Sequence, residues 1–201
     1  MPTTERRQFL LGSAAALVSS SALAAPDREV RTAMVGVGNR GTNLLSQVLQ
    51  QPGVKITAIC DTDAKARDAA QGAARRDNPK SYSDYRQALQ LDNVDAVVIA
   101  TPCYLHAEMA AACLEAGKYV YCEKPLGITP EQVDLVLKAS ARSKTFLQIG
   151  QQLRYVPSLR RSSEKSKRIR SSGTSLSLKR SATAPRYLPW LSRLARNGTR
   201  T

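Results

Sequence analysis

Short apolar runs alternate with amphipathic stretches along the chain from about residue 30 to residue 150. The apolar runs, at 32–37, 54–60, 94–100, 118–122 and 145–149, are nearly unbroken, as in strands that are buried on both faces. Stretches with helical spacing follow them near 39–51, 63–75 and 104–116, and a further helix starts at Thr129-Pro130. Because strands and helices alternate, we predict an α/β domain over residues 28–157 with a Rossmann-type, doubly wound parallel sheet.

Capping residues agree with this division. Gly117 stands where a helix C-cap is expected, and Thr129-Pro130-Glu131-Gln132 has an N-cap threonine, proline at the first helical position and glutamine at the third. For this last helix, the spacing predicts that one face consists of Val133, Val136, Leu137 and Ser140.

The periodic pattern stops at Pro157. Residues 158–201 hold ten serines, and their 12 lysines and arginines face a single acidic residue. Since high charge with few apolar residues disfavours a packed core, we predict a largely disordered, basic, Ser/Arg-rich tail.

The formal net charge of the chain is +14, and it is unevenly distributed. The tail carries most of it, whereas residues 25–157 contain 16 basic and 14 acidic residues. A basic arm for single-stranded nucleic acid would need stacking aromatics, and the tail offers only Tyr187 and Trp190. We therefore expect no specific nucleic-acid partner.

The first 24 residues have the layout of an export signal. A basic segment with Arg6-Arg7 precedes a weakly apolar, Ser/Ala-rich stretch that ends at Ala22-Leu23-Ala24. The paired arginines followed by Phe9-Leu10 resemble a twin-arginine signal. The stretch is shorter than the ~20 residues of a membrane-spanning helix. We expect the twin-arginine export machinery as a partner, a periplasmic or secreted protein and no stable membrane anchor; if the signal is not used, the protein is cytoplasmic.

Cysteine and histidine usage argues against a metal site. The four cysteines, at 60, 103, 113 and 122, lack Cys-x-x-Cys spacing, and His106 is the single histidine. We expect small buried thiols rather than disulfides, because the twin-arginine route exports proteins already folded in a reducing cytoplasm.

A Gly-x-Gly-x-x-Gly motif directly follows the first predicted strand and opens a helix. Gly36 would permit the tight turn, Gly38 would let a pyrophosphate approach the backbone, and Gly41 would let the helix pack on the strand. The helix start, with Asn39 and Arg40, would offer N–H groups and a positive dipole end to phosphates.

Asp61 lies 20 residues beyond Gly41, at the end of the next predicted strand. At this spacing an acidic residue accepts hydrogen bonds from the adenosine ribose and repels a 2′-phosphate, so we predict NAD rather than NADP. Arg40 and Lys65 keep NADP open as the alternative, since either cation could meet that phosphate.

Two further motifs end neighbouring predicted strands. They are Thr101-Pro102-Cys103-Tyr104-Leu105-His106 and Glu123-Lys124-Pro125, which we expect to meet over one crevice because ligands bind at the carboxyl ends of parallel strands. His106 is either a polar surface or capping residue or a functional group above that crevice. Lys124 is either paired with Glu123 or exposed, or it exchanges a proton with a substrate hydroxyl.

These motifs together resemble the glucose-fructose oxidoreductase/inositol dehydrogenase (Gfo/Idh/MocA) family. The resemblance rests on the glycine motif with Asp61, Thr-Pro-x-x-x-His at 101–106, the run that ends in Glu-Lys-Pro at 115–125, and Gln151 to Pro157, and it covers roughly residues 28–160. It implies an NAD(P)-binding Rossmann domain with Lys124 in the active site, supported by residues on the substrate side. Those supporting residues are His106, Glu123, Pro125, Arg154 and Tyr155. The cofactor would be held by Gly36, Gly38, Asn39, Arg40, Gly41, Asp61, Thr101 and Pro102.

In the family, Arg154-Tyr155 would lead into an α/β substrate domain with further catalytic Asp and His residues, and full-length members would be homo-oligomers. Residues 158–201 do not resemble such a domain. We hypothesise that they are incomplete or out-of-frame second-domain sequence produced by a frameshift, and that this chain has little or no turnover.

Three functions follow from the resemblance. The first is an exported NAD(P)-dependent oxidoreductase that acts on a sugar, a cyclitol or a related polyol. The alternatives are an NAD-dependent glycoside hydrolase of the same family and a non-catalytic dinucleotide-binding fragment.

Overall fold

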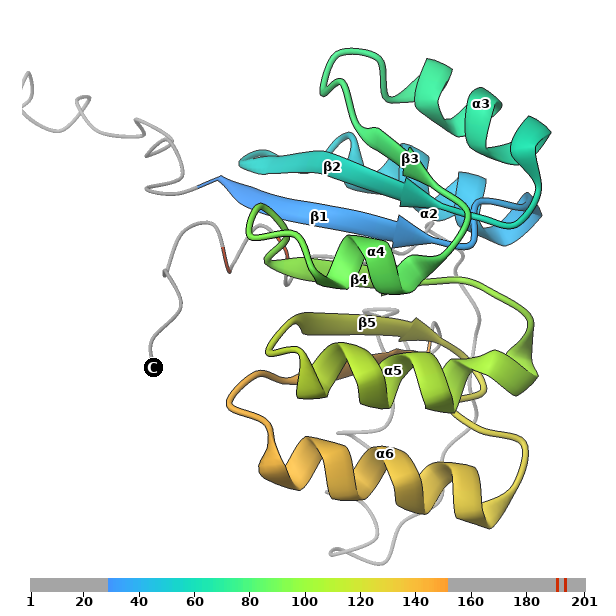
Figure 1. The fold of residues 1–201 in the computed structure, drawn as a ribbon, viewed down its shortest axis with the longest axis vertical. Helices are drawn as coiled ribbons and strands as arrows, with labels where there is room; N and C mark the ends of the chain where they lie inside the picture. The colour runs from blue at the N-terminus through green and yellow to red at the C-terminus, as the bar shows by residue number, and fades with distance from the viewer. Residues whose placement is uncertain (1–28, 152–190, 192–193, 195–201) are drawn as a thin grey trace, which may run out of the picture.

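Six parallel strands form one sheet in the computed structural model, which describes residues 29–151 together with Leu191 and Leu194 (Figure 1). The strands lie in the order β3-β2-β1-β4-β5-β6. They are β1 (Val30–Val35), β2 (Val54–Cys60), β3 (Lys80–Tyr82), β4 (Ala96–Ile99), β5 (Tyr119–Glu123) and β6 (Leu147–Gly150). Between them run α2 (Asn39–Val48), α3 (Ala64–Ala73), α4 (Tyr85–Leu89), the 3₁₀ turn η2 (Cys103–Leu105), α5 (His106–Glu115) and α6 (Pro130–Arg142). The predicted Rossmann-type sheet is confirmed.

One strand and one helix were not predicted. β3 has three residues, lies at the sheet edge and pairs only with β2 among the described strands, so its residues are exposed or half-buried. α4 has five residues. Neither is long enough to show a hydrophobic period, and we therefore predicted five strands where the structure has six.

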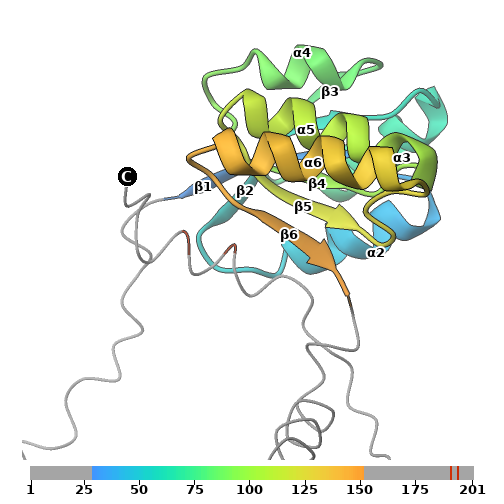
Figure 2. The ribbon, with the colours of Figure 1, turned by 90° about the horizontal axis from the view of Figure 1, so that it is seen from below.

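Helices lie on both faces of the sheet (Figure 2), and a layer of apolar side chains packs between the sheet and the helices on each face. α2 and α3 pack on one face, where their side chains meet Met34 of β1, Val98 of β4 and Tyr121 of β5. α4, α5 and α6 cover the other face, over Val97 and Val120. β4 is buried along its whole length, which explains its unbroken apolar sequence.

Leu191 and Leu194 are the two residues of the predicted tail that the structure describes, and disorder stays a prediction for the rest of 158–201, which lies outside the described residues. Both are helical and buried, and both belong to the layer formed with α2 and α3. Their spacing of three residues places them on one side of a helix. A low average hydrophobicity over 158–201 concealed this local apolar pair.

The capping predictions are confirmed. Gly117 adopts a positive φ of 69° after α5, and the Thr129 hydroxyl accepts a hydrogen bond from Gln132 N at 3.3 Å. The face predicted for α6 was wrong at Leu137, which is 60% exposed, because Val136 and Ala139 are the residues that α6 buries.

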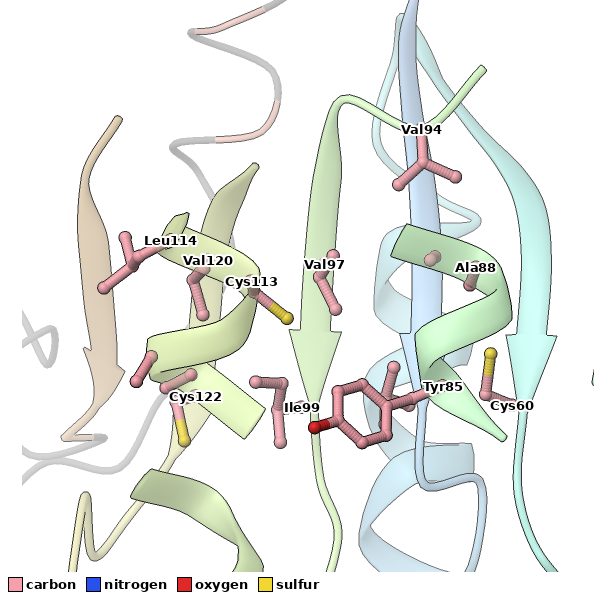
Figure 3. Close-up of a cluster of buried hydrophobic side chains, with 14 of the residues drawn as sticks. Cys60, Tyr85, Ala88, Val94, Val97, Ile99, Cys113, Leu114, Val120 and Cys122 are labelled. Atoms are coloured by element: carbon pink, nitrogen blue, oxygen red, sulfur yellow. The ribbon is translucent and has the colours of Figure 1, made fainter. Parts of the chain in front are cut away.

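Three of the four cysteines are the small buried thiols that we predicted. Figure 3 shows Cys60, Cys113 and Cys122 among the side chains of the second layer, and all four cysteines are free. Burial raises the pKa of Cys60 and of Cys122 to about 12. Cys103 is exposed, so the prediction was wrong there. Within the described part of the chain, no helix is long and apolar enough to cross a bilayer.

Candidate functional site

The turn between β1 and α2 has the geometry that its glycines suggested. Gly36 has a φ of 83°, and a Cβ at this position would stand 2.7 Å from Ala100 C. A Cβ on Gly41 would overlap the carbonyl of Gly36. Both positions therefore require glycine for the turn itself.

Gly38 differs from its neighbours in the motif. It is the N-cap of α2, it is exposed, and no atom lies within 4 Å of the place that its Cβ would occupy. Glycine is therefore not needed here for packing. The open space is what an approaching pyrophosphate would require, and it lies at the N-terminus, the positive end, of the ten-residue helix α2.

Asp61 follows β2 and joins the end of that strand to the glycine turn. Its Oδ2 accepts from Val37 N at 2.8 Å, and its Oδ1 accepts from Asp63 N at 3.0 Å. Each carboxylate oxygen can accept a further hydrogen bond. Asp61 is half-buried and thus reachable by the hydroxyls of a ribose.

A cleft of about 710 Å³ lies at the carboxyl ends of the strands. It joins three predicted segments, the glycine turn, the end of β2 and the Thr101-Pro102 loop. The start of α4 forms a fourth wall of the cleft, which we did not predict. Asp84, an N-cap whose side chain accepts from Arg86 N, is the sequence feature that could have indicated a helix start here. The lining of the cleft includes Gly36, Gly38, Asp61, Thr101, Pro102 and Tyr85. The volume suits a nucleotide-sized ligand.

The Glu-Lys-Pro segment ends β5 beside this cleft, and its two ionisable side chains have opposite environments. Glu123 is buried, with 4% exposed, whereas Lys124 is exposed. Lys124 does not line the cleft, and its backbone N–H donates to Glu123 Oε2 at 3.2 Å. The peptide bond between Lys124 and Pro125 is cis.

The ion pair of Glu123 is made with Arg40. Arg40 Nε and Nη2 donate to Glu123 Oε1 at 2.8 and 2.6 Å, and the Tyr121 hydroxyl donates to the same oxygen at 3.1 Å. Burial and the Glu123 charge raise the pKa of Tyr121, which therefore remains a donor. Arg40 pairs with Glu123 of β5 across 83 residues, a pairing that no sequence pattern indicated.

His106 is neither a surface residue nor a group above the crevice. Its side chain is buried, Nδ1 lies 2.6 Å from the Pro125 carbonyl oxygen, and Nε2 lies 2.9 Å from that of Thr101. A neutral ring donates to one of these carbonyls and a protonated ring to both. His106 therefore joins the Thr-Pro loop to the Glu-Lys-Pro segment, and the expected meeting of the two motifs is confirmed.

The remaining predicted site residues divide into two groups. Asn39 begins α2 beside Gly38, and its carbonyl accepts from Asn43 Nδ2 at 3.1 Å. Lys65 is exposed at the start of α3. Arg154 and Tyr155, together with the proposed signal at 1–24, lie outside the described residues.

Comparison with known proteins gives one family over nearly all of the described region. Residues 30–151 match the Gfo/Idh/MocA model, described as an oxidoreductase family with an NAD-binding Rossmann fold. The matched segment contains the glycine motif, Asp61 and the Glu-Lys-Pro segment.

Individual relatives carry different activities in their names. A glycosyl hydrolase family 109 protein of Stenotrophomonas maltophilia is 35% identical over 70% of this chain and 34% of its own length. A 4-carboxy-2-hydroxymuconate-6-semialdehyde dehydrogenase of Sphingobium is 36% identical over 64% of this chain and 40% of its own. The chain thus spans well under half of the curated relatives that it matches.

A solved structure agrees with the fold. The myo-inositol 2-dehydrogenase of Lactobacillus plantarum superimposes with a TM-score of 0.63 at 29% identity, over 73% of this chain and 42% of that one.

Proposed function

Because the chain belongs to the Gfo/Idh/MocA oxidoreductase family, we propose that it binds NAD in the cleft above β1, β2 and β4 as part of an enzyme that oxidises or reduces a sugar, a cyclitol or a related polyol. The observation that carries this proposal is the open space at Gly38, beside the α2 N-terminus and Asp61.

Each part of the cleft has a distinct role in this proposal. The N–H groups and positive end of α2 bind the anionic pyrophosphate, which approaches closely because Gly38 has no side chain. Asp61 accepts from the ribose hydroxyls of NAD and would repel the 2′-phosphate of NADP. Arg40, the cation that could meet that phosphate, is hydrogen-bonded to Glu123 of β5.

Lys124 is the proposed proton-transfer residue. Nicotinamide, when bound, supplies hydride acceptance and return. The ammonium of Lys124 would donate a hydrogen bond to the substrate oxygen and hold or release its proton as the oxygen changes between hydroxyl and carbonyl. The exposed position of Lys124 leaves it open to a substrate and to a covering domain.

Cofactor choice tests the proposal at Asp61. We expect NADH to bind at least tenfold more tightly than NADPH, measured by nicotinamide fluorescence. In Asp61→Ser this preference should fall about tenfold or more, since hydrogen bonds to a charged group contribute about 1.5–3 kcal/mol.

The control for this experiment is Asp134→Ser, which removes an exposed carboxylate from α6 and should leave both affinities unchanged. Equal binding of NADH and NADPH by the unaltered protein would exclude our assignment of Asp61. Absence of binding by either dinucleotide would refute the proposed function.

Glycoside hydrolysis is the second candidate, because the family 109 relative is 35% identical over 70% of this chain. Aryl glycosides and free polyols, each incubated with the protein and NAD, separate the two. Release of the aryl group without net NADH formation favours the hydrolase, and net NADH formation from a polyol favours the dehydrogenase.

A further inference from the structure

Lys124 stands between two residues that are each fixed by a long-range contact. On its N-terminal side, buried Glu123 is held by two hydrogen bonds from Arg40 and one from Tyr121. On its C-terminal side, the Pro125 carbonyl is held by His106.

Both contacts lead to the loops that line the cleft. Arg40 is the second residue of α2, next to the open space at Gly38. The second ring nitrogen of His106 lies 2.9 Å from the carbonyl of Thr101, which is a cleft residue. The segment that carries Lys124 is thus joined to the glycine turn on one side and to the Thr-Pro loop on the other.

The chemistry of the two contacts suits rigid placement. Arg40 presents two donors in a planar fork to one carboxylate oxygen, a geometry that a single ammonium cannot reproduce. His106 is buried with a stiff ring between two carbonyls, so that movement of a loop whose carbonyl the ring donates to would break a hydrogen bond away from water.

From this geometry we propose that Arg40 and His106 are positioning residues, which set the place of the Lys124 backbone relative to the dinucleotide cleft. Arg40 acts through Glu123, and His106 acts through the Pro125 carbonyl. The proposal rests on the proposed function, since it assigns these two residues to the placement of the proton-transfer lysine.

The test is the ¹⁵N order parameter of the Lys124 amide in the full chain without cofactor. In the unaltered protein it should be near 0.85, the value of rigid backbone. The variant His106→Phe removes both ring nitrogens and keeps an aromatic ring. The double variant Arg40→Met/Glu123→Gln removes both charges of the ion pair, so that no unpaired charge is left buried. In each, the Lys124 value should fall below about 0.6.

Three controls separate positioning from general loosening. Arg40→Lys, which keeps the charge but not the fork, should give an intermediate value. Arg142→Lys makes the same change in an exposed ion pair, in which Arg142 of α6 lies 2.9 Å from Glu115 of α5, and it should change nothing at Lys124. The amide of Val98, inside β4, should stay rigid in every variant.

An unchanged order parameter at Lys124, or a loss shared equally by Val98, would overturn the proposal. Dinucleotide binding is measured separately on the same samples. Its absence in the unaltered protein would refute the proposed function, while the order parameters would still decide whether Arg40 and His106 place Lys124.

Discussion

Within the glycine turn, neighbouring residues have different physical roles. Gly36 combines a positive φ with a backbone contact that leaves no room for a side chain, whereas Gly38 has ordinary negative φ and open space. The first serves the fold, and the second, in our proposal, serves the ligand.

This difference predicts opposite effects of alanine on stability. Gly36→Ala should lower the free energy of unfolding by about 1–3 kcal/mol or more, because it adds backbone strain and overlap with Ala100. Gly38→Ala should change it by less than about 0.5 kcal/mol. Urea denaturation measures both, and equal stabilities would show that the turn is not as tight as described.

Only some of the site residues could be predicted from the sequence. The roles of Gly36 and Gly41 in the turn were predictable because they depend on local spacing along one strand and one helix, whereas the role of Asp61 toward a ribose stays a prediction. The burial of His106 and the pairing of Arg40 with Glu123 were not predictable, because they depend on contacts between motifs far apart in the chain.

At the scale of elements, the long buried strands were predictable and the short exposed ones were not. The bounds predicted for β2 are those that it has, because most of its seven residues are apolar and such a run is easily recognised in the sequence. β3 is three residues long at the sheet edge and has no such pattern. The face of α6 was partly wrong because Leu137 is an apolar residue left exposed.

The layer formed with α2 and α3 predicts a role for Leu191 in stability. Because its side chain is fully buried, Leu191→Ala should lower the free energy of unfolding by about 2–5 kcal/mol. Leu137→Ala, the same change at a 60% exposed position, should have an effect below about 0.5 kcal/mol. Equal effects in chemical denaturation would contradict the packing of Leu191.

The buried thiols of the layer formed with α4, α5 and α6 should make the protein less stable at alkaline pH. The folded-state pKa of Cys60 and Cys122 is raised to about 12, from an ordinary value of 9.0, so the unfolded chain releases these protons first as the pH rises. The contribution of these neutral thiols to the free energy of unfolding is complete below about pH 9 and is lost as the pH approaches 12. The free energy of unfolding then falls by up to about 1.4 kcal/mol per pH unit for each thiol.

Denaturation between pH 8 and 11 measures this slope. The Cys60→Ala/Cys122→Ala variant should be less stable at neutral pH, owing to the cavities, yet should lose stability less steeply above pH 9. The same slope in both proteins would mean that other groups cause the alkaline loss.

At the scale of the whole molecule, the dinucleotide cleft and a proposed export signal are separate features of one chain. Residues 1–24 are proposed to direct export by the twin-arginine route. Arg6→Lys/Arg7→Lys should therefore retain the protein in the cytoplasm while leaving dinucleotide affinity unchanged, as measured by cell fractionation and NADH fluorescence. Equal export of the unaltered protein and of Arg6→Lys/Arg7→Lys would refute the assignment of residues 1–24 as a twin-arginine signal.

NADH titration of a matched pair of glycine variants decides whether the cleft beside Gly38 binds a dinucleotide. Gly38→Val fills the proposed pyrophosphate space, whereas Gly72→Val adds the same side chain at another open position, on α3. We expect saturable NADH binding by the unaltered protein and by Gly72→Val, and an affinity at least tenfold lower in Gly38→Val. Equal affinities in the two variants, or no saturable binding at all, would contradict dinucleotide binding in this cleft.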